Sequence, residues 1–227
     1  MTTVTAPATP RERVAELAAA RITALQRGYL DDQSHAVAAL ARLRRGAGRP
    51  AGQLPDLWAL IDTGPLHATP DGARPLGESE LVRAEDALNV ALTLYALHQQ
   101  SRRTGMHQAD RPGRSRGLGA SVRRMMTPGE IDGPVHKRLV RAGTAPDLIV
   151  LAQRLRDIVV LLRREDIELD YGLLAGQLYT WQWPGGADTV RRQWGRSFHA
   201  WHPQHAGSHP ADGSDSTSTP DTDKDAS

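Results

Sequence analysis

The chain of 227 residues contains no cysteine, a single phenylalanine and only two lysines. The absence of cysteine excludes a disulfide scaffold, a thiolate zinc site and a cysteine nucleophile, and it is typical of proteins in a reducing compartment. No apolar run approaches the roughly 20 residues that a membrane helix needs. The first ten residues have neither the basic nor the apolar segment of a secretory signal. We therefore expect a cytoplasmic protein that does not enter a membrane.

The formal net charge of +2 hides an uneven distribution of charged side chains. Residues 203–227 carry −4 and residues 1–202 carry +6, while residues 99–164 alone carry +9. Arginine supplies 26 of the 28 basic residues, and its guanidinium group can contact a phosphate through two hydrogen bonds. Codon bias explains most of the preference for arginine over lysine, but it does not explain the clustering. The cluster indicates a polyanionic partner, such as a nucleic acid.

Signals for β-strands are sparse, because β-branched and aromatic residues rarely alternate with polar ones. Signals for helix starts are frequent instead. Thr9-Pro10-Arg11-Glu12 has the pattern of a capping box, and helices also begin near Asp132 and Asp170. The pattern predicts about eight to nine helices, which include 33–45, 55–62, 79–103, 118–126, 147–164 and 188–201.

These helices predict an all-α fold of two small helical bundles. Residues 11–105 form the first bundle and residues 118–202 the second, after a disordered N-terminus over 1–10. The segment 106–117 joins the bundles as a basic loop that we expect to be mobile without a ligand. Residues 203–227 are mostly Ser, Thr, Asp and Pro, which predicts a disordered acidic tail.

Several local features follow from the same pattern. We expect the helix over 79–103 to be capped by Ser79 and to stop near Gly105, and the turn-rich segment 63–77 to be a loop. Apolar residues of two shorter helices are expected to face the core. These are Leu57, Trp58 and Ile61 in one helix, and Val135, Leu139 and Val140 in the other.

Three groups of residues invite a catalytic or metal-binding interpretation, and each is incomplete. His199, His202 and His205 have a spacing that suits zinc on a helix, but Pro203 interrupts the set and no cysteine or carboxylate completes it. Gly113–Gly119 is a glycine loop before a helix, without the Gly-Lys-Ser/Thr ending of a P-loop. It remains open as a phosphate contact or a flexible connection. The scattered acidic residues and histidines lack the converging carboxylates of a metal-dependent nuclease. We expect no catalysis, metal or cofactor.

The order of several short motifs resembles the CasB family, the small subunit of the type I-E CRISPR effector complex Cascade. The resemblance covers roughly residues 11–201, and it departs from the family in the long loop 63–77 and the acidic tail. The motifs that carry it are Leu40–Gly46, Leu54–Trp58, Gly117–Arg124, Lys137–Ala142, Leu155–Val159, Leu169–Leu174 and the closing Trp194 and Phe198.

The resemblance implies an all-helical protein with no catalytic activity of its own. It implies a head-to-tail homodimer that packs against the backbone and large subunits of Cascade. It also implies that a basic surface lies beside the crRNA-target DNA duplex and the displaced DNA strand. Our candidates for nucleic-acid contact are Arg44, Arg45, Arg123, Arg124, Lys137, Arg138, Arg141, Arg154 and Arg156.

Other interpretations of the basic residues remain open. Each candidate side chain could lie on a solvated helix face or contact a protein subunit. The chain could also be a helical adaptor whose basic face binds an acidic protein, without a nucleic-acid role. A helix-turn-helix regulator needs an exposed recognition helix, and we find no such pair of helices. Trp181 and Trp183 could stack on bases, although Trp181 fits the apolar stripe of its own helix and is expected in the core.

Overall fold

The computed structural model describes residues 8–68 and 74–201, and these residues form an all-α fold, as the sequence predicts. They contain ten α-helices and two short 3-10 segments. The elements are α1 (Pro10–Leu30), α2 (Ser34–Arg44), η1 (Ala51–Gln53), η2 (Pro55–Leu57), α3 (Trp58–Ile61), α4 (Gly64–His67), α5 (Glu78–Gln99), α6 (Leu118–Arg124), α7 (Gly133–Gly143), α8 (Leu148–Arg164), α9 (Tyr171–Trp181) and α10 (Gly186–Ala200).

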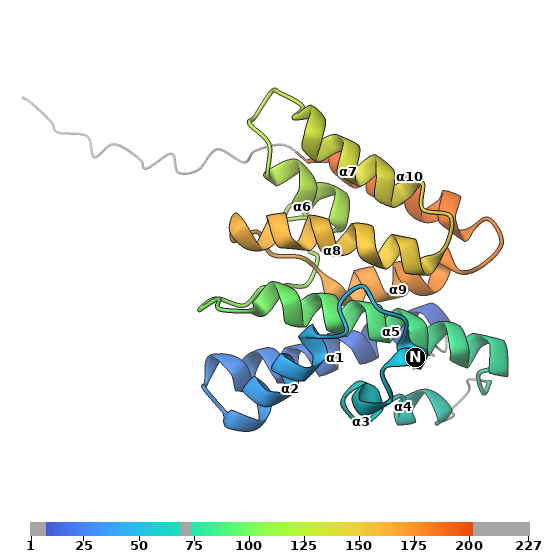
Figure 1. Ribbon diagram of the computed structural model, residues 1–227. Helices are drawn as coiled ribbons and strands as arrows, with labels where there is room; N and C mark the ends of the chain where they lie inside the picture. The colour runs from blue at the N-terminus through green and yellow to red at the C-terminus, as the bar shows by residue number, and fades with distance from the viewer. Residues whose placement is uncertain (1–7, 69–73, 202–227) are drawn as a thin grey trace, which may run out of the picture.

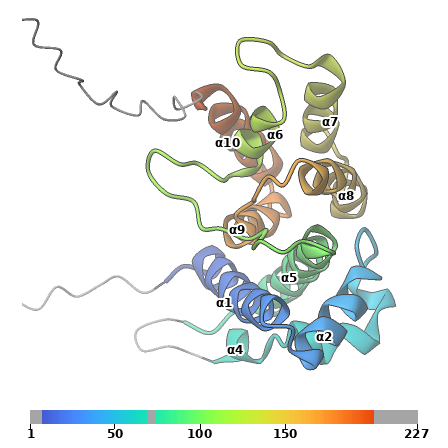
Figure 2. The same cartoon turned by 90° about the vertical axis from the view of Figure 1, so that its left-hand side faces the viewer.

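The helices form two groups that meet along α5. Helices α1–α4 lie on one side of α5, and α6–α10 lie on the other (Figures 1 and 2). From Ala87 to Gln99 every residue of α5 is buried, which is typical of a helix enclosed on all sides. Helix α9 packs against both α1 and α5. The buried apolar side chains of the two groups consequently form one continuous cluster.

Side-chain caps start several helices where the sequence predicts them. The Thr9 hydroxyl accepts a hydrogen bond from the Glu12 amide, and the Glu12 carboxylate accepts one from the Thr9 amide, which completes the capping box of α1. Asp132, Asp147 and Asp170 accept hydrogen bonds of 2.8–2.9 Å from amides in the first turns of α7, α8 and α9. Each cap satisfies an amide that has no partner within its helix.

Some local predictions are wrong. Gly77, and not Ser79, precedes α5, and this helix ends at Gln99, well before Gly105. The expected loop 63–77 contains the short helix α4, in which Leu66 is buried. The Arg13 guanidinium of α1 donates a hydrogen bond to the Leu66 carbonyl over 2.9 Å. A contact between residues so far apart in the chain leaves no periodic signal in the sequence.

Two apolar residues that were expected inside the protein lie on its surface. Trp58 is 63% exposed and Val140 is 48% exposed. The other members of their groups behave as predicted, because Leu57, Ile61 and Leu139 are buried and Val135 is partly buried. A helix of four residues such as α3 has too few turns for periodicity to fix its inward face.

The segment expected as a mobile basic loop is joined to the connection between α8 and α9. The Leu169 amide donates to the Met106 carbonyl over 3.1 Å, and the Gln108 amide donates to the Leu169 carbonyl over 3.3 Å. Gln26 of α1 binds both the amide and the carbonyl of His107, at 2.8 and 3.1 Å. Mobility of 106–117 stays a prediction. The predicted disordered tail, 203–227, and most of the predicted disordered N-terminus lie outside the described residues.

None of the helices in residues 8–68 and 74–201 has both the length and the apolar character to cross a membrane.

Candidate nucleic-acid interface

Helix α7 presents three of the nine candidate basic residues to solvent. Its inward positions are taken by Leu139 and Ala142, which are buried, so Lys137, Arg138 and Arg141 project from its exposed side. The Arg138 guanidinium donates to the Pro134 carbonyl over 3.2 Å. The side chains of Lys137 and Arg141 form no hydrogen bond or ion pair with any described residue. Their charges are therefore available to an anionic partner.

Helix α8 adds a fourth candidate to this surface. The guanidinium group of Arg154 donates a hydrogen bond to the Arg141 carbonyl, the last turn of α7. We call Lys137, Arg138, Arg141 and Arg154 the α7 basic face. Because α7 packs directly on α8, residues from two helices contribute to one surface. The carbonyl groups at the end of a helix also favour nearby cations, which stabilises Arg154 in this position.

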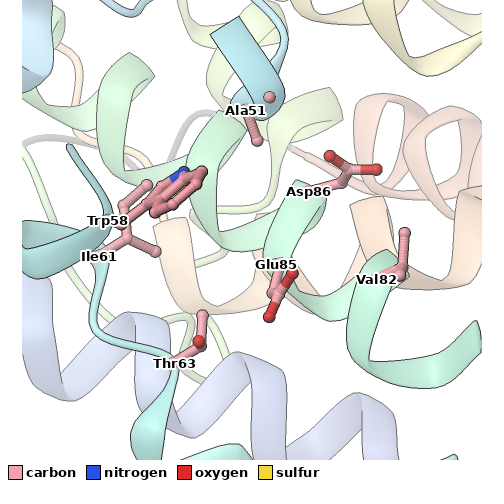
Figure 3. A pocket seen from close by; sticks show the side chains of 8 residues that line it. Ala51, Trp58, Ile61, Thr63, Val82, Glu85 and Asp86 are labelled. Atoms are coloured by element: carbon pink, nitrogen blue, oxygen red, sulfur yellow. The ribbon is translucent and has the colours of Figure 1, made fainter. Parts of the chain in front are cut away.

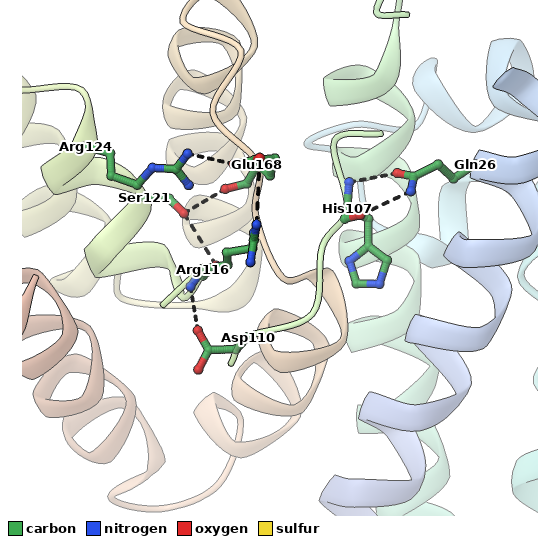
Figure 4. Close-up of polar contacts among 7 residues, drawn as sticks. All are labelled: Gln26, His107, Asp110, Arg116, Ser121, Arg124 and Glu168. Atoms are coloured by element: carbon green, nitrogen blue, oxygen red, sulfur yellow. Dashed lines mark hydrogen bonds and ion pairs between the residues drawn. The ribbon is translucent and has the colours of Figure 1, made fainter. Parts of the chain in front are cut away.

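The two candidates on α6 are held more tightly than the sequence predicts. Arg123 and Arg124 are both partly buried. Arg124 forms an ion pair with Glu168, with 2.7 Å between Nη2 and Oε2 (Figure 4). The Nη2 atom of Arg116, whose side chain is 3% exposed, lies 3.9 Å from the other oxygen of Glu168. The Arg124 side chain remains 25% exposed, but its charge already has a counter-charge within the protein.

The pKa values of this cluster reflect burial and charge pairing. Burial lowers the pKa of the Arg116 guanidinium, and the charge of Glu168 opposes that shift. Burial raises the pKa of Glu168, but the hydrogen bond from Arg124 and the nearby guanidinium charges outweigh it, so the pKa is lower than usual. Glu168 is therefore ionised at neutral pH and serves as the counter-charge for two arginines.

A hollow of about 540 Å³ lies beside α6 and joins basic and aromatic side chains. Arg114, Ser115, Arg124 and Trp201 line it. The Arg123 guanidinium lies 5.9 Å from the centre of the Trp201 ring, within the range of a cation–π contact. The sequence did not mark Arg114 or Trp201 as site residues. Trp201 follows the last turn of α10. A tryptophan placed just after a helix, beyond its packed face, was the sequence feature that could have indicated a surface site.

The remaining three candidates lie around the end of α2. Arg44 is partly buried and Arg45 exposed at the end of α2. Arg156 of α8 reaches the turn that follows α2, and its Cδ would be 3.3 Å from a Cβ atom built on Gly48. Arg156 of α8 thus lies beside the end of α2, whereas Arg154 of the same helix lies on the α7 basic face. Nucleic-acid contact by the nine candidates stays a prediction.

Two backbone amides of the glycine loop over 113–119 are already paired within the protein. The Asp110 carboxylate accepts hydrogen bonds from the amides of Arg116 and Gly117, at 2.5 and 3.2 Å, so an internal anion already occupies these donors. Gly119 has a packing role, because a Cβ atom there would lie 2.0 Å from the Trp194 carbonyl oxygen. Of the two arginines in this loop, Arg114 is exposed and Arg116 is buried.

The tryptophans considered for base stacking and the histidines considered for zinc binding form no such site among the described residues. Trp181 is 6% exposed and stacks on Trp194 with 5.6 Å between ring centres, as expected for a core residue. Trp183 lies under the Arg83 guanidinium at 4.2 Å. His199 is exposed on α10, and His202 and His205 lie outside the described residues. The part of the chain that the structure describes holds no group of three potential metal ligands.

The fold and the surface charges define an all-helical protein with basic side chains gathered on neighbouring helices. The family model for CRISPR-associated protein Cse2 matches residues 39–199. A crystal structure of CasB from Thermobifida fusca is 50% identical, with a TM-score of 0.72, over 82% of this chain and 98% of that chain. The chain therefore belongs to the Cse2 family of CRISPR-associated proteins, and the resemblance to CasB is confirmed.

A second solved structure supports the fold alone. It is a chain from a CRISPR RNA-guided surveillance complex, 18% identical, with a TM-score of 0.58. The alignment covers 82% of this chain and 95% of that chain. No curated protein matches the sequence.

Proposed function

We propose that this protein is the non-catalytic small subunit of a type I-E CRISPR Cascade surveillance complex and acts in the cytoplasm. In this proposal its basic helical surface holds the crRNA-target DNA duplex and the displaced DNA strand. Membership of the Cse2 family supports the assignment to such a complex. The observation that carries the nucleic-acid role is the exposure of Lys137 and Arg141 on one side of α7, without an ion-pair partner among the described residues.

The physical mechanism is electrostatic and does not require the protein to read bases. Opening a target exchanges a DNA duplex for an RNA–DNA duplex of similar stability, so modest contacts to the backbone shift the equilibrium. Basic side chains that neutralise phosphates release bound counterions, and this gain is independent of sequence. The α7 basic face suits this role, whereas recognition of the target sequence belongs to the guide RNA.

The proposed partners are crRNA, target DNA including the displaced strand, and the backbone and large subunits of Cascade. A second copy of the chain is proposed to bind head to tail within the complex. The acidic-protein adaptor is the alternative that the experiment must distinguish, because an acidic protein surface would also be attracted to Lys137 and Arg141.

The test is a charge reversal on α7, Lys137→Glu plus Arg141→Glu. Both side chains are exposed, so we expect the melting temperature to change little. The isolated variant should bind labelled single-stranded DNA of unrelated sequences more weakly, and its salt slope should fall by about 1.4 if each residue contacts one phosphate. Within the assembled complex, the lifetime of the R-loop should be shorter, with unchanged guide-pairing rules.

The matched control is Arg11→Glu plus Arg27→Glu. It makes the same charge change at exposed positions of α1, outside the basic segment 99–164. We expect the control to retain most of the DNA affinity. Equal loss in both variants would mean that only net charge matters. An unchanged R-loop lifetime in the α7 variant, together with weaker binding to an acidic protein, would favour the adaptor instead.

A further inference from the structure

A second surface, which carries acidic and apolar groups in place of basic ones, lies between the η1–α3 segment and α5. It is a hollow of about 560 Å³ lined by Ala51, Gly52, Trp58, Ile61, Thr63, Val82, Glu85 and Asp86. Figure 3 shows the Trp58 indole on one side and the carboxylates of Glu85 and Asp86 on α5 across from it. The hollow therefore combines an aromatic ring, two acidic groups and apolar walls.

Two of the large apolar side chains that line the hollow are exposed. The Trp58 side chain is 63% exposed and Val82 is 48% exposed, although both have the apolar area that normally favours burial. Exposed tryptophan is enriched at binding surfaces, because a large rigid ring gives much contact area for little loss of conformational entropy. A partner that covers Trp58 would bury this area.

The acidic groups of the hollow have no partner within the described chain. Glu85 and Asp86 are partly buried, and no hydrogen bond or ion pair links their carboxylates to any residue in 8–68 or 74–201. Arg49 lines a neighbouring hollow together with Asp86 but forms no ion pair with it. Burial, and then the charge of Glu85, raise the pKa of Asp86. A cation in this place would relieve both effects.

We propose that this Trp58 hollow receives an arginine side chain from a protein partner. A guanidinium group stacks on an aromatic ring and forms paired hydrogen bonds with carboxylates, and its methylene chain packs on apolar walls. Trp58, Glu85 with Asp86, and Ile61 with Val82 supply these three elements in one hollow. A nucleic acid is disfavoured here, because the two carboxylates repel phosphate.

The test uses acetyl-arginine-amide as the probe and the intact protein as the receptor. Binding is followed through the indole N–H signal of Trp58 in NMR spectra, assigned with Trp58→Phe. We expect saturable shifts of this signal by the arginine compound. The acetyl-citrulline-amide has nearly the same shape without the charge and should leave the signal unchanged. The lysine compound should bind more weakly, because its ammonium lacks the planar guanidinium.

The diagnostic variant is Glu85→Gln plus Asp86→Asn, which keeps the size of both side chains. We expect it to weaken arginine binding about tenfold, in line with the loss of one strong charge-assisted contact. The control, Glu130→Gln plus Asp157→Asn, removes two negative charges from exposed positions elsewhere and should bind arginine as the parent does. Far-UV circular dichroism checks that α5 remains helical.

Three outcomes would overturn the inference: no shift of the Trp58 signal with arginine, equal binding of citrulline, or equal arginine binding by the Glu85/Asp86 variant. None of these outcomes bears on the nucleic-acid role of α7. Conversely, a failure of the Lys137 and Arg141 experiment leaves the arginine site intact. The two proposals therefore stand or fall separately.

Discussion

Gly119 is the residue that allows α6 to lie directly against α10. A Cβ atom at this position would be 2.0 Å from the Trp194 carbonyl oxygen and 2.8 Å from the Phe198 amide. Both contacts are with backbone, which cannot move without shifting a helix. We expect Gly119→Ala to lower the free energy of unfolding by about 3 kcal/mol, as for other overpacked sites, in urea titrations followed by circular dichroism.

The control for this prediction is Gly195→Ala. Gly195 also lies within a helix, but a Cβ atom there would meet nothing within 4 Å. Alanine favours the helix over glycine by up to about 1 kcal/mol, so this change should stabilise the protein. Destabilisation by both changes, to a similar extent, would contradict the packing role of Gly119.

His98 is buried in the contact between the two helical groups, and it gives the protein a predicted acid sensitivity. Its Nδ1 atom lies 2.9 Å from the Tyr171 hydroxyl oxygen, and burial lowers the pKa of His98 from 6.5 to about 3. In the unfolded chain His98 takes up a proton near pH 6.5, whereas in the folded protein it does so only near pH 3. The contribution of His98 to stability is therefore fully present above pH 6.5 and is lost progressively as the pH falls toward 3.

Between pH 7 and pH 5, the contribution of His98 amounts to a loss of about 2 kcal/mol. The measurement is urea unfolding at both pH values for the parent and for His98→Gln, whose side chain does not titrate. We expect the variant to be less stable at pH 7 but to lose less stability on acidification. Identical pH dependence in the two proteins would show that His98 is not kept neutral by the fold.

Among the structural elements, α6 depends on a charge contributed by the α8–α9 connection. Glu168 pairs with Arg124 and lies near the buried Arg116. Removing the carboxylate leaves a buried guanidinium without a counter-charge, which is costly. We expect Glu168→Gln to lower the free energy of unfolding by about 2 kcal/mol, less than for a fully buried pair, because Glu168 remains 19% exposed. Thermal and urea unfolding measure the change.

A nearby ion pair gives the control for Glu168. Arg102 and Asp166 are 2.8 Å apart, but the Asp166 side chain is 56% exposed, and exposed pairs contribute little. Asp166→Asn should therefore change stability by less than about 0.5 kcal/mol. If both substitutions cost the same, the buried position of Arg116 would not explain the effect of Glu168.

The helices that the sequence predicts well are those with local signals. The capping residues Thr9, Asp132 and Asp170 each bind an amide in the first turn of the helix that they start. Because the cap and its partner are close in the sequence, a short sequence pattern predicts them. The pairing of Arg124 with Glu168 joins residues 44 positions apart, and it depends on how α6 meets the connection after α8. The sequence therefore predicts a basic helix at 118–126, but not which of its charges is already neutralised.

The candidate site shows the same division between local and distant information. Leu139 of α7 is buried as predicted, and with Ala142 it leaves Lys137, Arg138 and Arg141 on the exposed side of the helix. The joining of Arg154 to the same surface requires the packing of α7 on α8. The Trp58 hollow was missed because Trp58 lies in a short helix, whose exposed side is decided by its neighbours in space.

At the scale of the whole molecule, the continuous core predicts a single unfolding transition. Helix α9 packs against α1 and α5 of the other group, and the buried apolar residues of both groups form one cluster. Neither group can lose its structure without exposing the apolar surface of the other. Calorimetry of the full chain should give equal calorimetric and van't Hoff enthalpies. Two resolved transitions would instead show two independent folding units.

The shared core also fixes how far apart the basic residues lie. Arg45 follows α2 in one group, and Arg141 lies in the last turn of α7 in the other. Helices α5, α8 and α9 connect these groups through buried contacts. A nucleic-acid backbone that touches both residues must adopt the separation that the fold imposes. The protein would then select nucleic acids by the geometry of their backbone. It would bind strands that already span this distance more tightly than strands in a more compact conformation.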